Sequence, residues 1–144
     1  MIDSTRFPDA QSAKAQTNRP LQQQRAIVDF LRAMVVAKPD EGERFHAVFL
    51  DGEQTILGDA PLGQARAGSL SLRMREIFQL ALSMDAEGMI VAHNHPSGQC
   101  RPSAFDITAT RRLKDIARAL DIELLDHLII TTSSVYSMRA GGDL

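Results

Sequence analysis

The spacing of apolar positions predicts helices and strands in alternation from residue 21 onward. Apolar residues recur at helical spacing from Leu21, and Pro39 ends that segment because proline cannot continue a helix. Residues 44–50 are rich in β-branched and aromatic side chains, as in a strand, and they run into Asp51-Gly52, a strong hairpin signal. Residues 54–57 are then expected to form the returning strand.

The rest of the chain continues the alternation and ends in two strands. Ser103 and Asp106 have the spacing of a helix capping box, in which the serine is the N-cap and Asp106 replaces the usual glutamate. The other predicted elements are a loop or irregular edge segment at 58–71, a helix at 74–84, a buried strand at 88–92, a helix after Ser103, and strands at 122–131 and 135–139. This order predicts an α/β (mixed α+β) fold in which helices pack on a sheet.

Length and composition limit the class of protein. The chain has 144 residues, of which 44% are hydrophobic and 24% charged, as expected for one soluble domain with a sizeable core. Residues 1–20 carry few apolar side chains, so we expect a flexible N-terminal tail followed by a domain at 21–144. The formal net charge of −2 gives no overall attraction to nucleic acid or to an anionic membrane.

Cysteine content and hydropathy favour a cytoplasmic protein. Cys100 is the one cysteine of the sequence, so no internal disulfide can form, which fits a reducing compartment. The first twenty residues lack the apolar core of a signal peptide. Apolar runs are shorter than the roughly 18 residues of a membrane span, and we expect no membrane partner.

The chemistry-bearing residues gather after the predicted strand at 88–92. His93 and His95 are two positions apart at its end, so their side chains point to the same side of the sheet. Asp106, at the start of the next helix, can return to complete a site with three ligands. Three protein ligands and one open position are what a catalytic zinc ion (Zn²⁺) needs.

A hydrolytic zinc site also needs a carboxylate that moves protons and does not itself bind the metal. Glu43, ahead of the first strand, and Glu53, in the hairpin turn, are the main candidates. More ordinary interpretations stand beside these roles. Ser103 and Asp106 also fit plain capping, and His127 fits a structural pair with Asp126 that fixes the last strand.

The spacing of these residues resembles a known metal-binding motif. His93-x-His95-Pro96, followed after six residues by Ser103 and after two more by Asp106, is similar to the JAMM motif of the JAB/MPN metalloproteases. The chain resembles the RadC-like branch of that superfamily most clearly at residues 43–51, 93–98 and 125–130. The similarity as a whole runs from about residue 21 to residue 139.

This resemblance implies a fold and a set of roles. The fold is an MPN/JAB-type mixed β-sheet flanked by helices, with zinc held by His93, His95 and Asp106. The family's water-activating glutamate falls on Glu43. The motif serine, Ser103, is implied to support the oxyanion of a tetrahedral intermediate.

Three functions are therefore carried forward. The first is a zinc-dependent metallohydrolase of amide bonds, a peptidase or isopeptidase that acts on a peptide or protein substrate. The second is a RadC-like DNA-repair-associated factor that binds nucleic acid, which is not favoured because aromatic residues for base stacking are few. The third is a non-catalytic MPN binding module.

Overall fold

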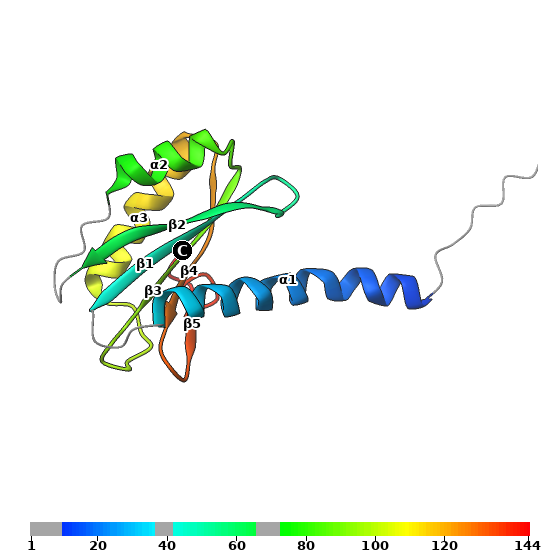
Figure 1. Cartoon of the computed structure of the whole chain (residues 1–144), viewed down its shortest axis with the longest axis horizontal. Coiled ribbons are helices and arrows are strands. Elements are labelled where there is room, and N and C mark those ends of the chain that lie inside the picture. The colour runs from blue at the N-terminus through cyan, green and yellow to red at the C-terminus, as the bar shows by residue number, and fades with distance from the viewer. Residues whose placement is uncertain (1–9, 37–41, 66–72) are drawn as a thin grey trace, which may run out of the picture. The chain divides into compact units, whose positions relative to one another are not determined.

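The computed structural model describes residues 10–36, 42–65 and 73–144 (Figure 1). The described residues up to residue 30 and those from residue 31 onward form two compact units. Parts of three predictions lie outside the described residues. They are the first nine residues of the tail, the helix stop at Pro39, and the last six residues of the segment 58–71, predicted as a loop or an irregular edge segment.

The first helix, α1, spans Ala10–Val36 and so begins well before the predicted start at Leu21. Residues 10–20, predicted to be part of a loose tail, are helical instead. Alanine, glutamine and lysine dominate residues 10–16, and their high helix propensity favours a helix over that stretch. The domain boundary at residue 21 stays a prediction.

The described strands form one mixed sheet in the order β2-β1-β3-β4-β5. The strands are β1 (Glu43–Leu50), β2 (Ile56–Ala65), β3 (Gly88–Asn94), β4 (Glu123–Ile130) and β5 (Val135–Ser137). The pair β3 and β4 is parallel, and the other neighbours are antiparallel. The mixed α/β fold with helices on a sheet is confirmed.

Strand β2 is longer than the predicted returning strand, which ended at residue 57, and it includes the first part of the segment predicted as a loop or an irregular edge segment. It continues to Ala65 and occupies an edge of the sheet. An edge strand needs little burial on its outer side, and it tolerates Pro61 because one row of its backbone groups has no ladder partner. The weak apolar pattern of residues 58–65 is thus that of an irregular edge strand, with two shifts in its register against β1.

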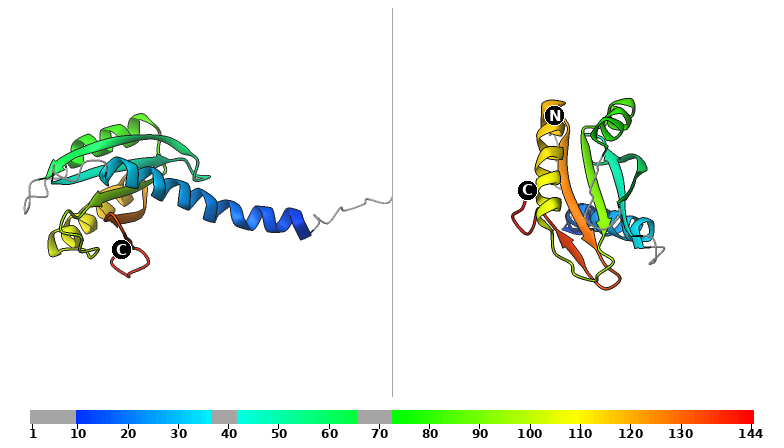
Figure 2. Two further views of the ribbon diagram at one scale, coloured as in Figure 1. Left: turned by 60° about the horizontal axis from the view of Figure 1, so that its bottom comes forward. Right: turned by 90° about the vertical axis from the view of Figure 1, so that its left-hand side faces the viewer.

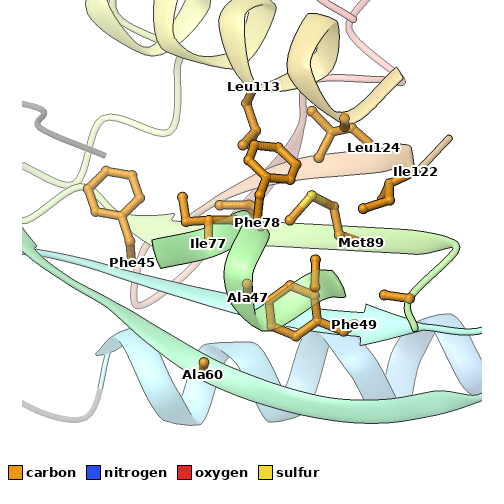
Figure 3. Close-up of a cluster of buried hydrophobic side chains, with 14 residues drawn as sticks. Phe45, Ala47, Phe49, Ala60, Ile77, Phe78, Met89, Leu113, Ile122 and Leu124 are labelled. Atoms are coloured by element: carbon orange, nitrogen blue, oxygen red, sulfur yellow. The ribbon is translucent and has the colours of Figure 1, made fainter. Parts of the chain in front are cut away.

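Helices α2 (Met74–Ser83) and α3 (Ala104–Ala119) contribute to one apolar core with the sheet (Figure 3). Phe78 of α2, Leu113 of α3 and Met89 of β3 are buried in this cluster. Figure 2 shows α3 running beside β4. The capping box predicted at Ser103 and Asp106 is present in both directions and starts α3.

The buried stripe of α3 changes character along its length. Asp106 and Thr110 are buried in its first half, and Leu113 and Ala117 in its second. The polar half lies toward the end of β3 at which the two motif histidines occur, so the candidate site extends the core at one end of the sheet.

Candidate metal centre and adjoining pocket

His93, His95 and Asp106 converge in the structure. One potential ligand atom from each lies within 4.8 Å of the others. His95 Nε2 is 3.0 Å from Asp106 Oδ2, and His93 Nε2 is 3.3 Å from Asp106 Oδ1. The strand end and the helix start that the sequence analysis placed together are therefore together.

The capping box positions Asp106 and uses only one of its two carboxylate oxygens. Oδ2 accepts a hydrogen bond of 2.8 Å from the backbone N–H of Ser103, whose hydroxyl accepts from the backbone N–H of Asp106 at 3.1 Å. Oδ1 is buried and accepts no hydrogen bond from the described residues. A buried carboxylate oxygen without a donor is costly unless a cation compensates it, so this arrangement fits a metal ion.

The ring of His95 is oriented by the turn that follows it. Its Nδ1 donates to the carbonyl of Gln99 at 2.8 Å, which leaves Nε2 unprotonated in the neutral ring and directed at the cluster. Gly98 makes this turn with a positive φ of 80°, a conformation that favours glycine, and its N–H donates to the carbonyl of His95.

The ring of His93 is held from two sides. Phe45, its partner across the β1–β3 pair, stacks on it with ring centroids 4.7 Å apart. His93 Nδ1 is 2.6 Å from Nε2 of His127, and Nδ1 of His127 is 2.6 Å from the hydroxyl of Thr110. Sequence reasoning missed this contact, because it depends on the register of β3 against β4, which places His127 beside Val91.

The predicted pairing of Asp126 with His127 is present only through the backbone. Asp126 Oδ1 accepts from the backbone N–H groups of His127 and Arg139, and Oδ2 accepts from the hydroxyl of Ser137. Asp126 thereby fixes β5 and the turn after it, whereas the His127 ring faces the opposite direction, toward His93.

The electrostatics of the cluster keep Asp106 ionised and His127 neutral, and they favour the protonated form of His95. Burial raises the pKa of Asp106, but its contacts with His93 and His95 outweigh this and hold the pKa well below its usual range, so the carboxylate is ionised. The hydrogen bond with Asp106 raises the pKa of His95 against the opposing effect of burial. Burial lowers the pKa of His127, which keeps that ring neutral.

A pocket of about 530 Å³ adjoins the cluster and contains both predicted catalytic residues. Its lining includes Glu43, His95 and Ser103. The middle residue of the motif, Asn94, holds the backbone on both sides of Glu43. Its side chain accepts from the N–H of Arg44 at 2.6 Å and donates to the carbonyl of the residue before Glu43 at 3.2 Å.

Glu53, the other candidate for proton transfer, lies away from the cluster, as do His46 and Cys100. Glu53 is in the turn after β1, at the end of the strand opposite Glu43, with its N–H bonded to Asp51. His46 is buried in β1, and its Nε2 is 2.6 Å from Asp59. The thiol of Cys100 donates to the carbonyl of Ile129 and does not belong to the metal cluster.

The mixed sheet and the His-His-Asp cluster define an α/β protein with a candidate metal centre. The family model of the RadC-like JAB domain matches residues 21–143. The chain belongs to this family. The part of the chain described by the structure has no helix that is long and apolar enough to cross a membrane.

Curated relatives are similar in sequence to most of this chain. A UPF0758 protein of Paraburkholderia xenovorans (strain LB400) is 38% identical over 117 residues, which are 81% of this chain and 46% of the relative. A UPF0758 protein of Staphylococcus carnosus (strain TM300) is 38% identical over 100 residues, 69% of this chain and 44% of the relative. The chain spans about half the length of the curated relatives it matches.

Proposed function

We propose that this domain is a zinc-dependent hydrolase of amide bonds, a peptidase or isopeptidase. The observation that carries the proposal is the shared pocket: Glu43 and Ser103 line the same cavity as His95, one of the three candidate ligands. A proton-transfer group and a hydroxyl donor thus lie beside a candidate metal centre, which is the set of groups that amide hydrolysis needs.

His93, His95 and Asp106 would hold the zinc ion. Two neutral imidazoles and one carboxylate are typical zinc ligands, and three protein ligands leave a position open for catalysis. When bound, zinc supplies Lewis-acid polarisation of a carbonyl and a hydroxide nucleophile at neutral pH. The buried Oδ1 of Asp106, which accepts no hydrogen bond from the described residues, supports this assignment.

Glu43 is assigned the proton transfer. Its carboxylate takes a proton from the attacking water and later gives it to the nitrogen of the departing amine. The carboxylate is close enough to His95 to help raise the pKa of that ring. The two hydrogen bonds from Asn94 hold the backbone around Glu43, so the carboxylate is attached to a fixed segment at the start of β1.

Ser103 is assigned the stabilisation of the oxyanion. Its oxygen accepts the capping hydrogen bond from Asp106 N–H, which leaves the hydroxyl proton available for a substrate oxygen in the pocket. One side chain therefore caps α3 and donates to the charge that develops on the carbonyl oxygen during attack.

The test is a cleavage screen with matched variants. Zinc-loaded protein is incubated with a diverse peptide library and with lysine isopeptide conjugates, and the products are identified by mass spectrometry. We expect Glu43→Gln to abolish cleavage while zinc content is unchanged, and Ser103→Ala to lower kcat by about 10²–10³-fold, as loss of an oxyanion donor does. The control Glu53→Gln keeps full activity, because Glu53 is at the other end of β1.

Two results would overturn the proposal. Cleavage that survives in Glu43→Gln would remove Glu43 from the reaction. Stoichiometric zinc with no cleavage of either substrate class would leave a metal-bearing binding module as the function of the domain.

A further inference from the structure

We propose that Thr110 and His127 form a buried hydrogen-bond relay that sets which ring nitrogen of His93 faces the metal centre. The relay runs from Met138 through Thr110 and His127 to His93. It rests on the proposed metal centre and deepens it, because it assigns a positioning role to two residues that are not ligands.

The contacts of the relay are short and continuous. The Thr110 hydroxyl oxygen is 2.6 Å from His127 Nδ1 and 3.6 Å from Met138 Sδ. His127 Nε2 is in turn 2.6 Å from His93 Nδ1. All four side chains are completely buried, so water does not compete for these groups.

The direction that we assign to the relay is the one that a metal ligand requires. The Thr110 hydroxyl directs its proton at Met138 Sδ, and its oxygen accepts from His127 Nδ1–H. A neutral His127 then has an unprotonated Nε2, which accepts from His93 Nδ1–H. His93 is left with an unprotonated Nε2, the nitrogen that lies 2.9 Å from His95 Nε2 and 3.3 Å from Asp106 Oδ1.

With the opposite direction of the hydrogen bonds, His93 would present a protonated nitrogen to the metal centre. If Thr110 donated to His127 Nδ1, His127 would carry its proton on Nε2 and donate it to His93. A neutral His93 would then carry a proton on the nitrogen that faces Asp106, and a metal ion would have to displace that proton. Metal-ligating histidines are commonly oriented by a partner of their second nitrogen, and here that partner is a second, neutral histidine.

Packing alone does not explain these residues. Thr110 is on the same buried stripe of α3 as Leu113, and His127 is on the strand next to Met89 and Val91. Apolar side chains at both positions would continue the adjoining core without the desolvation of polar groups. Thr110 and His127 instead form a chain of polar contacts that ends on His93, one of the three candidate ligands.

The first experiment measures zinc affinity in substituted proteins by competition with a chromophoric chelator. His127→Leu removes the acceptor for His93 Nδ1–H, and we expect zinc affinity to fall by about 10–100-fold, as it does when such partners are lost. His127→Gln restores an oxygen acceptor near the position of Nε2, and its affinity is expected to stay within a few-fold of the wild type.

A second pair of variants tests the far end of the relay with less disturbance of the core. Thr110→Val keeps the shape and removes the hydroxyl, whereas Thr110→Ser keeps the hydroxyl. We expect Thr110→Val to bind zinc several-fold more weakly than Thr110→Ser. A purely structural role would instead lower unfolding stability in these variants and leave the zinc affinity of the folded protein unchanged.

Long-range ¹H–¹⁵N NMR of the zinc-loaded wild type reads the proton positions directly. We expect His93 to carry its proton on Nδ1 and His127 to carry its proton on Nδ1. A proton on His127 Nε2, or equal zinc affinity in wild type, His127→Leu and Thr110→Val, overturns the relay while the metal centre stands. If the wild type fails to bind zinc, the metal centre and the relay fail together.

Discussion

The two halves of the interface between α3 and the sheet differ in chemistry although they belong to one continuous layer. The second half is apolar, with Leu113 buried against a cluster that includes Met89 and Leu124. The first half is polar and equally buried, with Asp106 and Thr110 facing histidines. Burial is similar, but one half stabilises the fold by removing apolar surface from water and the other has to be compensated by hydrogen bonds and, in our proposal, by a cation.

This difference separates stability from function within a single helix. Substitutions in the apolar half should lower the free energy of unfolding of the metal-free protein and leave metal affinity alone. Substitutions in the polar half should act mainly on metal affinity. The following predictions test that separation, beginning with the largest expected effect.

Leu113→Ala should destabilise the fold by about 2–5 kcal/mol, because it removes a completely buried side chain and leaves a cavity. Urea denaturation of the metal-free protein measures this loss. Zinc affinity of the folded variant, determined below its unfolding midpoint, is expected to remain within a few-fold of the wild type. A parallel loss of zinc affinity would contradict the separation.

Asp106→Asn should weaken zinc binding by more than the roughly 100-fold that loss of an outer partner costs, because it removes the anionic ligand while keeping the shape. Isothermal titration calorimetry measures the affinity. Asp59→Asn is the matched control, since Asp59 also contacts a histidine, His46, but in a pair away from the cluster. Equal effects of the two substitutions would remove Asp106 from the site.

Zinc should stabilise the wild type by about 2.7 kcal/mol at a free concentration 100 times its Kd, because it binds the folded state. Thermal unfolding with and without a chelator gives the shift. Leu113→Ala should show the same increment, and Asp106→Asn at the same zinc concentration should show almost none. An increment that survives in Asp106→Asn would place the zinc elsewhere.

The smallest effect concerns protons that compete with the metal. In the metal-free protein, NMR titration should give a pKa for His95 above its usual 6.5, because Asp106 stabilises the protonated ring. Asp106→Asn should lower that pKa, and Asp59→Asn should not. Since a raised pKa keeps His95 protonated to higher pH, zinc affinity of the wild type should fall as the pH drops through it. An unchanged His95 pKa in Asp106→Asn would contradict this account.

Local patterns in the sequence predicted the cluster of candidate ligands and the helix that supports it. His93, His95 and Asp106 are close in the chain, and a strand end, a turn and a capping box are enough to bring them together. The order of helices and strands followed from periodicity in the same way. These features depend on interactions between residues only a few positions apart.

Other features depend on distant segments and could not be predicted from local patterns. The contact between His93 and His127 requires the register of β3 against β4, and the extent of β2 requires that it lie at an edge of the sheet. The two hydrogen bonds between the Asn94 side chain and the backbone on either side of Glu43 join residues about fifty positions apart. The position of Thr110, four residues after Asp106 on the same face of α3, was a visible signal, but its meaning depended on His127.

X-ray absorption spectroscopy of the zinc-loaded protein tests the central claim most directly. The account predicts one zinc ion per chain with two imidazole nitrogens at about 2.0–2.1 Å, a carboxylate oxygen at about 2.0–2.2 Å and no sulfur. Two results would contradict the assignment of His93, His95 and Asp106 as the metal centre. One is a zinc content well below one ion per chain, and the other is a sulfur neighbour at about 2.3 Å, which would make Cys100 a ligand.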